Sequence, residues 1–213
     1  SMFNPLWLNM DHPEVSNEEM MSRVIRFEDV QEHPIPLMFI DSPLEGHQRL
    51  NYAVIGDTAS ENDEYSPMLN APHTFQIGMV YALPGNGPAW HTHDYVEIFM
   101  PMSGKWEFFW TNEKDGEAEG SAVLGQFDII SLPPGLWRRF EVQGDESEGA
   151  WIFAVLDEHK VFEGKDPYWA KSVEDAAEGA GFHADEKGKM VKPDNYADVR
   201  QMLLDKISAT MKK

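Results

Sequence analysis

Short hydrophobic segments with a strand-like pattern fill the middle of the chain. From residue 24 onward, runs rich in β-branched and aromatic residues alternate with short polar turns, which is typical of an antiparallel sandwich or barrel. The predicted strands are VIRFEDV (24–30), PLMFID (36–41), RLNYAVIG (49–56), HTFQIGMVYAL (73–83), AWHTHDYVEIFM (89–100), KWEFFWTN (105–112), AEGSAVL (118–124), QFDIISL (126–132), LWRRFEVQ (136–143) and GAWIFAVLD (149–157). We therefore expect an all-β fold with two sheets or a closed barrel.

The segments on either side of these strands have a different pattern. Residues 1–23 lack hydrophobic periodicity and are predicted to form an N-terminal arm, followed by a β-barrel over 24–160. The polar stretch 57–72 is too long for a hairpin turn and is predicted to be a surface loop. Residues 161–213 are expected to be a helical extension that belongs to the same domain.

Two helices are predicted in this C-terminal extension. Asp166-Pro167 has the character of a helix start, with Gly179 and Gly181 as stop signals. The second helix is expected to begin near Asp194, because apolar residues recur after it at helical spacing. These residues are Tyr196, Val199, Leu203 and Ile207.

Composition and charge narrow the function classes. The chain has 213 residues with 17 Lys and Arg against 37 Asp and Glu, a net charge of −20, which disfavours binding to nucleic acid or to an anionic membrane surface. It has no cysteine, which excludes disulfides, thiolate metal sites and cysteine nucleophiles. No apolar run approaches the roughly 18 residues of a membrane span, so we expect a soluble, cytoplasmic protein.

The segment GNGPAWHTHDYVEIFMPMSG (85–104) concentrates metal-binding side chains. Alternate residues of a strand share one face, so His91, His93 and Glu97 are predicted to point the same way. Two imidazoles and one carboxylate form the ligand set of non-haem Fe(II) sites that keep open coordination positions. We predict that these three residues bind a divalent transition metal; iron is the expectation, and the ligand set also suits Mn, Ni or Zn.

This segment resembles the first signature motif of the cupin superfamily. The matching spacing is Gly85, five residues, His91-x-His93, three residues, Glu97, six residues and Gly104. A looser counterpart of the second cupin motif is GQFDIISLPPGLWRRF (125–140), which contains Asp128 and Pro133-Pro134-Gly135. The resemblance implies a cupin double-stranded β-helix (a jelly roll), here with an N-terminal arm and C-terminal helices.

Arg138 stands where cupins usually carry a further metal-binding histidine. An arginine has no free lone pair and cannot replace that ligand. If a metal binds, the ion, Glu97 and Arg138 together leave a positive pocket, so the substrate would be a small anion held partly by Arg138. If no metal binds, Glu97 and Arg138 can pair and the site is a polar cavity.

Further residues are candidates for a pocket beside the metal. Tyr95 shares the ligand face and is the candidate for a catalytic acid or base. Phe99, Phe108, Phe140 and Gln76 are expected to contact the substrate, although the aromatic residues suit plain barrel filling equally well. His73 or Gln76 is a candidate fourth metal ligand, with water as the alternative.

Cupins host many unrelated activities, so the resemblance leaves the reaction open. We expect a metal-dependent cupin enzyme that acts on a small anionic organic substrate, with a non-haem iron dioxygenase as the first hypothesis. The alternatives are a Lewis-acid isomerase, lyase or decarboxylase, and a non-catalytic small-molecule-binding cupin in which Glu97 pairs with Arg138. Because cupins often exchange edge strands between two copies, we also expect a homodimer, with the predicted N-terminal strands as candidates for the exchange.

Overall fold

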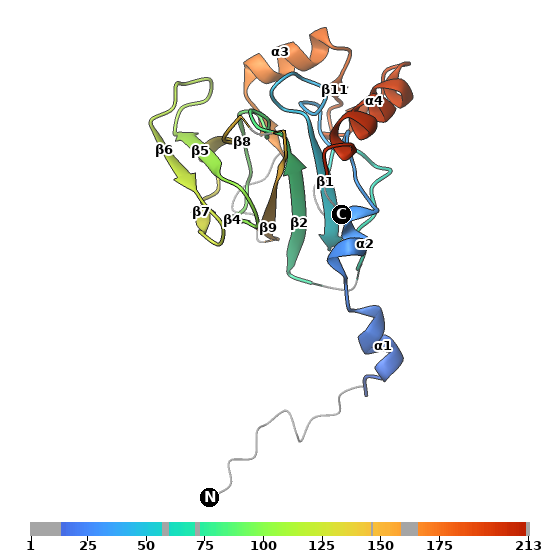
Figure 1. The fold of residues 1–213 in the computed structure, drawn as a ribbon. Helices are drawn as coiled ribbons and strands as arrows, with labels where there is room; N and C mark the ends of the chain where they lie inside the picture. The colour runs from blue at the N-terminus through green and yellow to red at the C-terminus, as the bar shows by residue number, and fades with distance from the viewer. Residues whose placement is uncertain (1–13, 57–59, 71–72, 146, 159–165, 212–213) are drawn as a thin grey trace, which may run out of the picture.

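The computed structural model describes residues 14–56, 60–70, 73–145, 147–158 and 166–211. Two five-stranded antiparallel sheets form most of this part of the chain (Figure 1). In spatial order, sheet I consists of β1 (Arg49–Ile55), β2 (Phe75–Ala82), β9 (Ala150–Asp157), β4 (Glu97–Pro101) and β7 (Ile130–Leu132). Sheet II consists of β10 (Tyr168–Trp169), β3 (His91–Thr92), β8 (Trp137–Val142), β5 (Trp106–Thr111) and β6 (Gly120–Leu124). The predicted all-β jelly roll is confirmed.

The predicted strands from residue 49 onward are present, with one difference in the ligand segment. The predicted strand 89–100 is two strands, β3 in sheet II and β4 in sheet I, and residues 93–96 lie between them. The chain therefore crosses from one sheet to the other inside the segment that carries the candidate ligands.

The two earliest predicted strands were wrong. The end of the segment 24–30 belongs to the helix α2 (Phe27–Gln31). The first turn of this helix carries Glu28 and Asp29, which is a favourable position for negative charge. Residues 36–41 form turns in which the backbone N–H of Ile40 donates to the Glu61 carboxylate instead of to a neighbouring strand. Val30 and Leu37 are buried in the core although neither belongs to a strand. Tertiary packing therefore overrides the strand preference of these two segments.

Two hydrophobic clusters lie on opposite faces of sheet I. The inner cluster fills the space between the sheets with Phe99, Trp106, Phe108, Phe140 and Ile152 among its members. The outer cluster joins the other face of sheet I to the helices; it includes Tyr52, Tyr81, Trp151, Leu203 and Ile207. Figure 1 shows α2 and α4 (Tyr196–Ser208) beside β1 on this outer side.

The C-terminal extension contributes to sheet II as well as covering sheet I. The helix α3 (Lys171–Gly179) begins after the predicted start at Asp166-Pro167, because residues 168–169 form β10 and pair with β3. A small hairpin follows, made of β11 (His183–Ala184) and β12 (Met190–Val191). The second predicted helix is present as α4, which begins at Tyr196.

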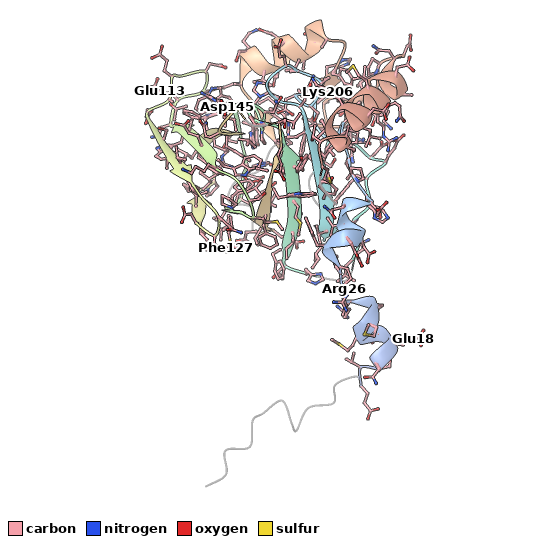
Figure 2. The ribbon with its side chains drawn as sticks, viewed as in Figure 1. Glu18, Arg26, Glu113, Phe127, Asp145 and Lys206 are labelled. Atoms are coloured by element: carbon pink, nitrogen blue, oxygen red, sulfur yellow. The ribbon has the colours of Figure 1, made fainter. Side chains whose placement is uncertain are left out.

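The first helix lies away from the sheets. The helix α1 (Asn17–Ser22) buries none of its residues, and Figure 2 shows Glu18 at a distance from the sheets. Residues 1–13 of the predicted arm lie outside the described residues. No helix in the described part of the chain has both the length and the apolar character that a bilayer crossing requires.

The predicted surface loop 57–72 is partly buried. Within its described part, Glu61 is 1% exposed and Asn62 is 5% exposed. Glu61 accepts hydrogen bonds from the backbone of Ile40 and from the indole of Trp169. This polar segment therefore connects the turns at 36–41 to β10.

Candidate metal centre

The three predicted ligands come together in the interior. One nitrogen of His91, one nitrogen of His93 and one oxygen of Glu97 all lie within 4.8 Å of one another, and all three residues are buried. In a regular strand, the Cα atoms of His91 and Glu97 would be about 20 Å apart, because each residue advances the chain by roughly 3.3 Å. The crossing from β3 to β4 removes this separation, so the shared face of a single strand is not what brings the ligands together.

Hydrogen bonds at Nδ1 fix the orientation of both imidazoles. His91 Nδ1 lies 2.7 Å from the carbonyl oxygen of Ala89, and His93 Nδ1 lies 2.6 Å from Oδ1 of Asp166. Both partners are acceptors, so each Nδ1 carries a proton, and in the neutral imidazole this leaves the lone pair on Nε2. Metal-binding histidines commonly have this arrangement, with the second ring nitrogen held by a carboxylate or a carbonyl.

Glu97 faces two different groups with its two oxygens. Oε1 accepts a hydrogen bond of 3.2 Å from Nη1 of Arg138, while Oε2 lies 3.4 Å from Nε2 of His93. Arg138 is fully buried and also donates to the carbonyl oxygen of Pro133. Pairing with Arg138 therefore leaves Oε2 available, and the same carboxylate can contact the arginine and ligate a metal.

The donor set fits a bound cation. In a neutral His93 with its proton on Nδ1, Nε2 and Oε2 of Glu97 are two acceptors that face each other at 3.4 Å. Two lone pairs at this distance in a buried site are unfavourable unless a proton or a cation lies between them. His91, His93 and Glu97 can thus hold a divalent metal ion, as the sequence motif predicts.

The environment of His91 keeps its imidazole neutral. Burial lowers the pKa of His91 well below the ordinary value of 6.5, and the nearby His93, Arg138 and Arg49 lower it further. A neutral imidazole is the form that binds a metal, so no proton has to leave His91 at neutral pH.

A cavity of about 90 Å³ opens beside the ligands, which is room for a small organic molecule. His91, His93 and Glu97 all line it, and most of the remaining wall is apolar. Residues from sheet I, from the segment 38–39 and from Pro167 and Trp169 supply that wall.

Tyr95 lies in this cavity next to the ligands. Its ring stacks on His93 with 4.7 Å between the ring centroids, and its side chain is 3% exposed. The carboxylate of Asp166 lies close enough to interact with the hydroxyl directly, and Glu97 acts on it electrostatically. Burial, reinforced by these two carboxylates, raises the pKa of Tyr95 well above 10, so its hydroxyl stays protonated and can donate a hydrogen bond.

The other predicted pocket residues have different positions. Phe99 and Phe140 line the cavity, whereas Phe108 lies behind it, stacked on Phe140 with 4.5 Å between centroids. Gln76 and Arg138 are buried but do not line the cavity.

Among the histidines, aspartates and glutamates of the described residues, none joins the three predicted ligands as a fourth ligand. The group close enough to share an ion consists of His91, His93 and Glu97. His73, the other histidine considered, makes an edge contact with the ring of Phe75. The coordination positions left over by three protein ligands are those that a substrate or water would occupy.

Sequence reasoning missed several residues that support the site. Asp166 holds His93, and Trp169 lies beside His91 with 5.4 Å between ring centroids. Arg49, on β1, lines the cavity and forms a buried ion pair with Asp41. The available signal was an arginine at the start of a strongly apolar strand segment, RLNYAVIG, where a charged residue requires a buried partner.

No protein-family model matches the chain, and neither does any curated protein sequence. Solved structures resemble it weakly. A cupin-2 domain protein from Rhodospirillum rubrum is 12% identical with a TM-score of 0.43, and the match covers 74% of this chain and 80% of that protein's chain. A cupin 2 domain-containing protein from Halorhodospira halophila is 14% identical with a TM-score of 0.41, covering 61% of this chain and 75% of its own.

A DMSP lyase, DddQ from Ruegeria pomeroyi, is 18% identical with a TM-score of 0.40 and covers 56% of this chain. This chain spans about half the length of the two lyase chains matched, 53% and 50%. Likenesses of this strength carry no conclusion about activity. The fold assignment depends on the two sheets described above, and the assignment of the metal site depends on the arrangement of His91, His93 and Glu97.

Proposed function

We propose that this chain, whose two sheets form the jelly roll of the cupin superfamily, is a metal-dependent enzyme acting on a small organic molecule. The first candidate is an iron-dependent dioxygenase with His91, His93 and Glu97 as the metal ligands. The observation that carries the proposal is that these three buried ligands all line one mostly apolar cavity.

The ligand set favours a catalytic over a structural metal. Structural zinc sites are usually closed by four protein ligands, whereas three ligands leave positions for substrate. Two histidines and one carboxylate with open positions are typical of non-haem Fe(II) sites, and bound iron would supply the redox chemistry that reactions with O2 require.

The protein's own residues would position and protect the reacting groups. Ala89 and Asp166 fix the two imidazoles, and Arg138 holds the carboxylate of Glu97. Tyr95 presents a protonated hydroxyl that would donate to a substrate oxygen. The apolar walls limit water in the cavity, which strengthens these polar interactions.

Lewis-acid chemistry is the second candidate, because of Tyr95. A buried, protonated phenol beside a metal is a suitable proton donor for an isomerase, a lyase or a decarboxylase. The non-catalytic reading draws support from the Glu97–Arg138 pair, which neutralises the carboxylate without any metal.

Oxygen consumption distinguishes these candidates. The protein, reconstituted with Fe(II) under nitrogen, would be mixed with a panel of small aromatic, aliphatic and dicarbonyl acids, and O2 uptake and product formation would be recorded. We expect substrate-dependent O2 uptake that His93→Ala abolishes and that the exposed-site control His33→Ala leaves unchanged. Turnover under nitrogen would contradict the dioxygenase and support the Lewis-acid reaction, while metal binding without turnover in either gas would support the binding protein.

A further inference from the structure

Arg49 is a second buried arginine near the metal centre, and unlike Arg138 it lines the cavity. It is 1% exposed and lies on the inward face of sheet I. Its backbone neighbours across the sheet, Ala82 and Ala150, belong to the cluster between the sheets.

The guanidinium of Arg49 is held rigidly but keeps a donor free. Nη1 and Nη2 donate to the two carboxylate oxygens of Asp41 at 3.1 and 2.9 Å, and Nη1 also donates to the carbonyl of His47 at 2.7 Å. The Nε–H has no hydrogen-bond partner in the structure. A buried charged donor without a partner is costly, and such a group in a cavity wall indicates that a ligand supplies the acceptor.

The same carboxylate connects Arg49 to the metal ligands. Oδ2 of Asp41 accepts a hydrogen bond of 2.9 Å from the backbone N–H of Ala89, whose carbonyl oxygen holds Nδ1 of His91. Arg49 lines the same cavity as His91, His93 and Glu97. Arg49 and the metal ligands therefore border one small space.

A row of small residues gives this space its volume. Ala53, Gly78 and Ala154 are in register across the neighbouring strands β1, β2 and β9, and all three line the cavity. A Cβ atom added to Gly78 would meet only one atom within 4 Å, the carbonyl oxygen of Tyr52 at 3.2 Å. The floor of the cavity is thus left open by small side chains, while the metal ligands and Arg49 supply its polar edges.

We propose that Arg49 is the substrate-binding residue for a carboxylate, and that the cavity takes a small acid held between the metal and Arg49 over the row of Ala53, Gly78 and Ala154. This inference rests on the proposed metal-dependent function and specifies the substrate class for the same site. It assigns to Arg49 the anion-binding role predicted for Arg138, which pairs with Glu97 and does not line the cavity.

Two isosteric probes isolate the contribution of Arg49 from that of the metal. Malonate has two carboxylates, and 3-methylbutanoate replaces one of them with an isopropyl group of similar size, so both can bind a metal but only malonate offers a second carboxylate to Arg49. Because malonate can also chelate the ion through both carboxylates, the comparison of the wild type with Arg49→Met measures the contribution of Arg49, and the wild-type preference alone does not. Calorimetric titration of the Zn(II)-loaded protein is expected to show tighter binding of malonate. Arg49→Met is expected to weaken malonate binding about 10- to 100-fold, the range for a hydrogen bond to a charged group, and to change 3-methylbutanoate binding less than about 2-fold.

Metal content and a matched variant complete the experiment. Arg139→Met, at an outward-facing position of β8, is the control and should bind both acids as the wild type does. Unchanged malonate affinity in Arg49→Met, or an equal loss for both acids, would overturn the proposal. The same titration on metal-free protein separates the two claims: a chain that binds no metal refutes the proposed function, while Arg49-dependent malonate binding still supports this subsite.

A cavity-filling variant tests the subsite without touching the Arg49–Asp41 pair. Ala154→Leu adds three carbon atoms on the floor of the cavity and should abolish binding of both acids while the zinc content stays at the wild-type level. If Ala154→Leu binds malonate as tightly as the wild type, the acid does not occupy this cavity and the proposal fails. This variant tests whether the acid occupies the cavity even where Arg49→Met does not fold.

Discussion

Each imidazole of the candidate site presents Nε2 to the interior because a hydrogen bond at Nδ1 fixes its tautomer. For His91 the acceptor is a backbone carbonyl two residues away, and for His93 it is the carboxylate of Asp166, 73 residues further along the chain. The ligands themselves are visible in the motif spacing. Asp166 is not, because nothing local in the sequence indicates which distant residue will contact His93.

Removing the Asp166 carboxylate should weaken metal binding. Asp166→Ala takes away the acceptor that orients His93 and makes it more basic, and a 10- to 100-fold loss of affinity for Zn(II) is typical of such changes. Competition with a chelating dye measures this affinity. Asp128→Ala, which removes a carboxylate from an exposed turn, is the control, and equal affinities in both variants would show that Asp166 does not support the site.

Arg138 should stabilise the metal-free protein. Arg138→Met leaves the buried Glu97 carboxylate without its cation, which typically costs about 3–5 kcal/mol in the free energy of unfolding. Urea unfolding of metal-free protein measures the loss, and saturating Zn(II) should restore part of it because the ion replaces the missing positive charge. Arg139→Met, half-exposed on the same strand, should change stability by less than about 0.5 kcal/mol. Full stability of metal-free Arg138→Met would contradict this role.

At the scale of elements, the strands after residue 49 could be predicted because each is a short β-rich run bounded by turn residues. The helix α2 could not, because its residues suit a strand, and the burial of Val30 and the contact of Phe27 with Trp151 are not visible in the local sequence. The break between β3 and β4 was also missed. It follows from the crossing between sheets, which no periodicity within 89–100 indicates.

The last glycine of the first motif closes a turn that only glycine fits well. Gly104 has φ +66°, and an added Cβ would lie 2.7 Å from the Cβ of Ala150. We expect Gly104→Ala to lower the free energy of unfolding by about 1–3 kcal/mol, through backbone strain and this contact. Gly179→Ala, where a Cβ meets nothing within 4 Å, is the control in thermal or urea unfolding. Equal effects of the two substitutions would show that the turn does not require glycine.

At the scale of the whole molecule, the loop carrying Glu61 joins the N-terminal turns to β10 beside the metal centre. Ile40 and Trp169 donate to its carboxylate, and the backbone N–H of Met190 donates to its carbonyl oxygen. Composition indicated a solvated loop here because most of the segment is polar. Burial of two of its residues depends on contacts with distant parts of the chain, which composition does not reveal.

Glu61 should make stability fall as the pH rises. Burial, assisted by Asp41, raises the pKa of Glu61 from 4.5 to about 8, although Trp169, Ile40 and Arg49 oppose the shift. Between these two values the folded chain holds a proton at Glu61 that the unfolded chain has lost, so increasing pH favours unfolding. Glu61→Gln replaces this group with one that does not titrate. In urea unfolding, the free energy of unfolding of the wild type minus that of the variant should therefore decrease between pH 5 and pH 8. A constant or increasing difference would contradict this role of Glu61.

Metal content measured by elemental mass spectrometry tests the central claim most directly. Protein reconstituted with Fe(II) under nitrogen and freed of excess metal should retain about one ion per chain, as expected of a preformed site with three converging ligands. His93→Ala should lose it, whereas His33→Ala, at an exposed position, should keep it. Wild-type protein that retains less than about a tenth of an equivalent after the same treatment would show that His91, His93 and Glu97 do not form a metal centre.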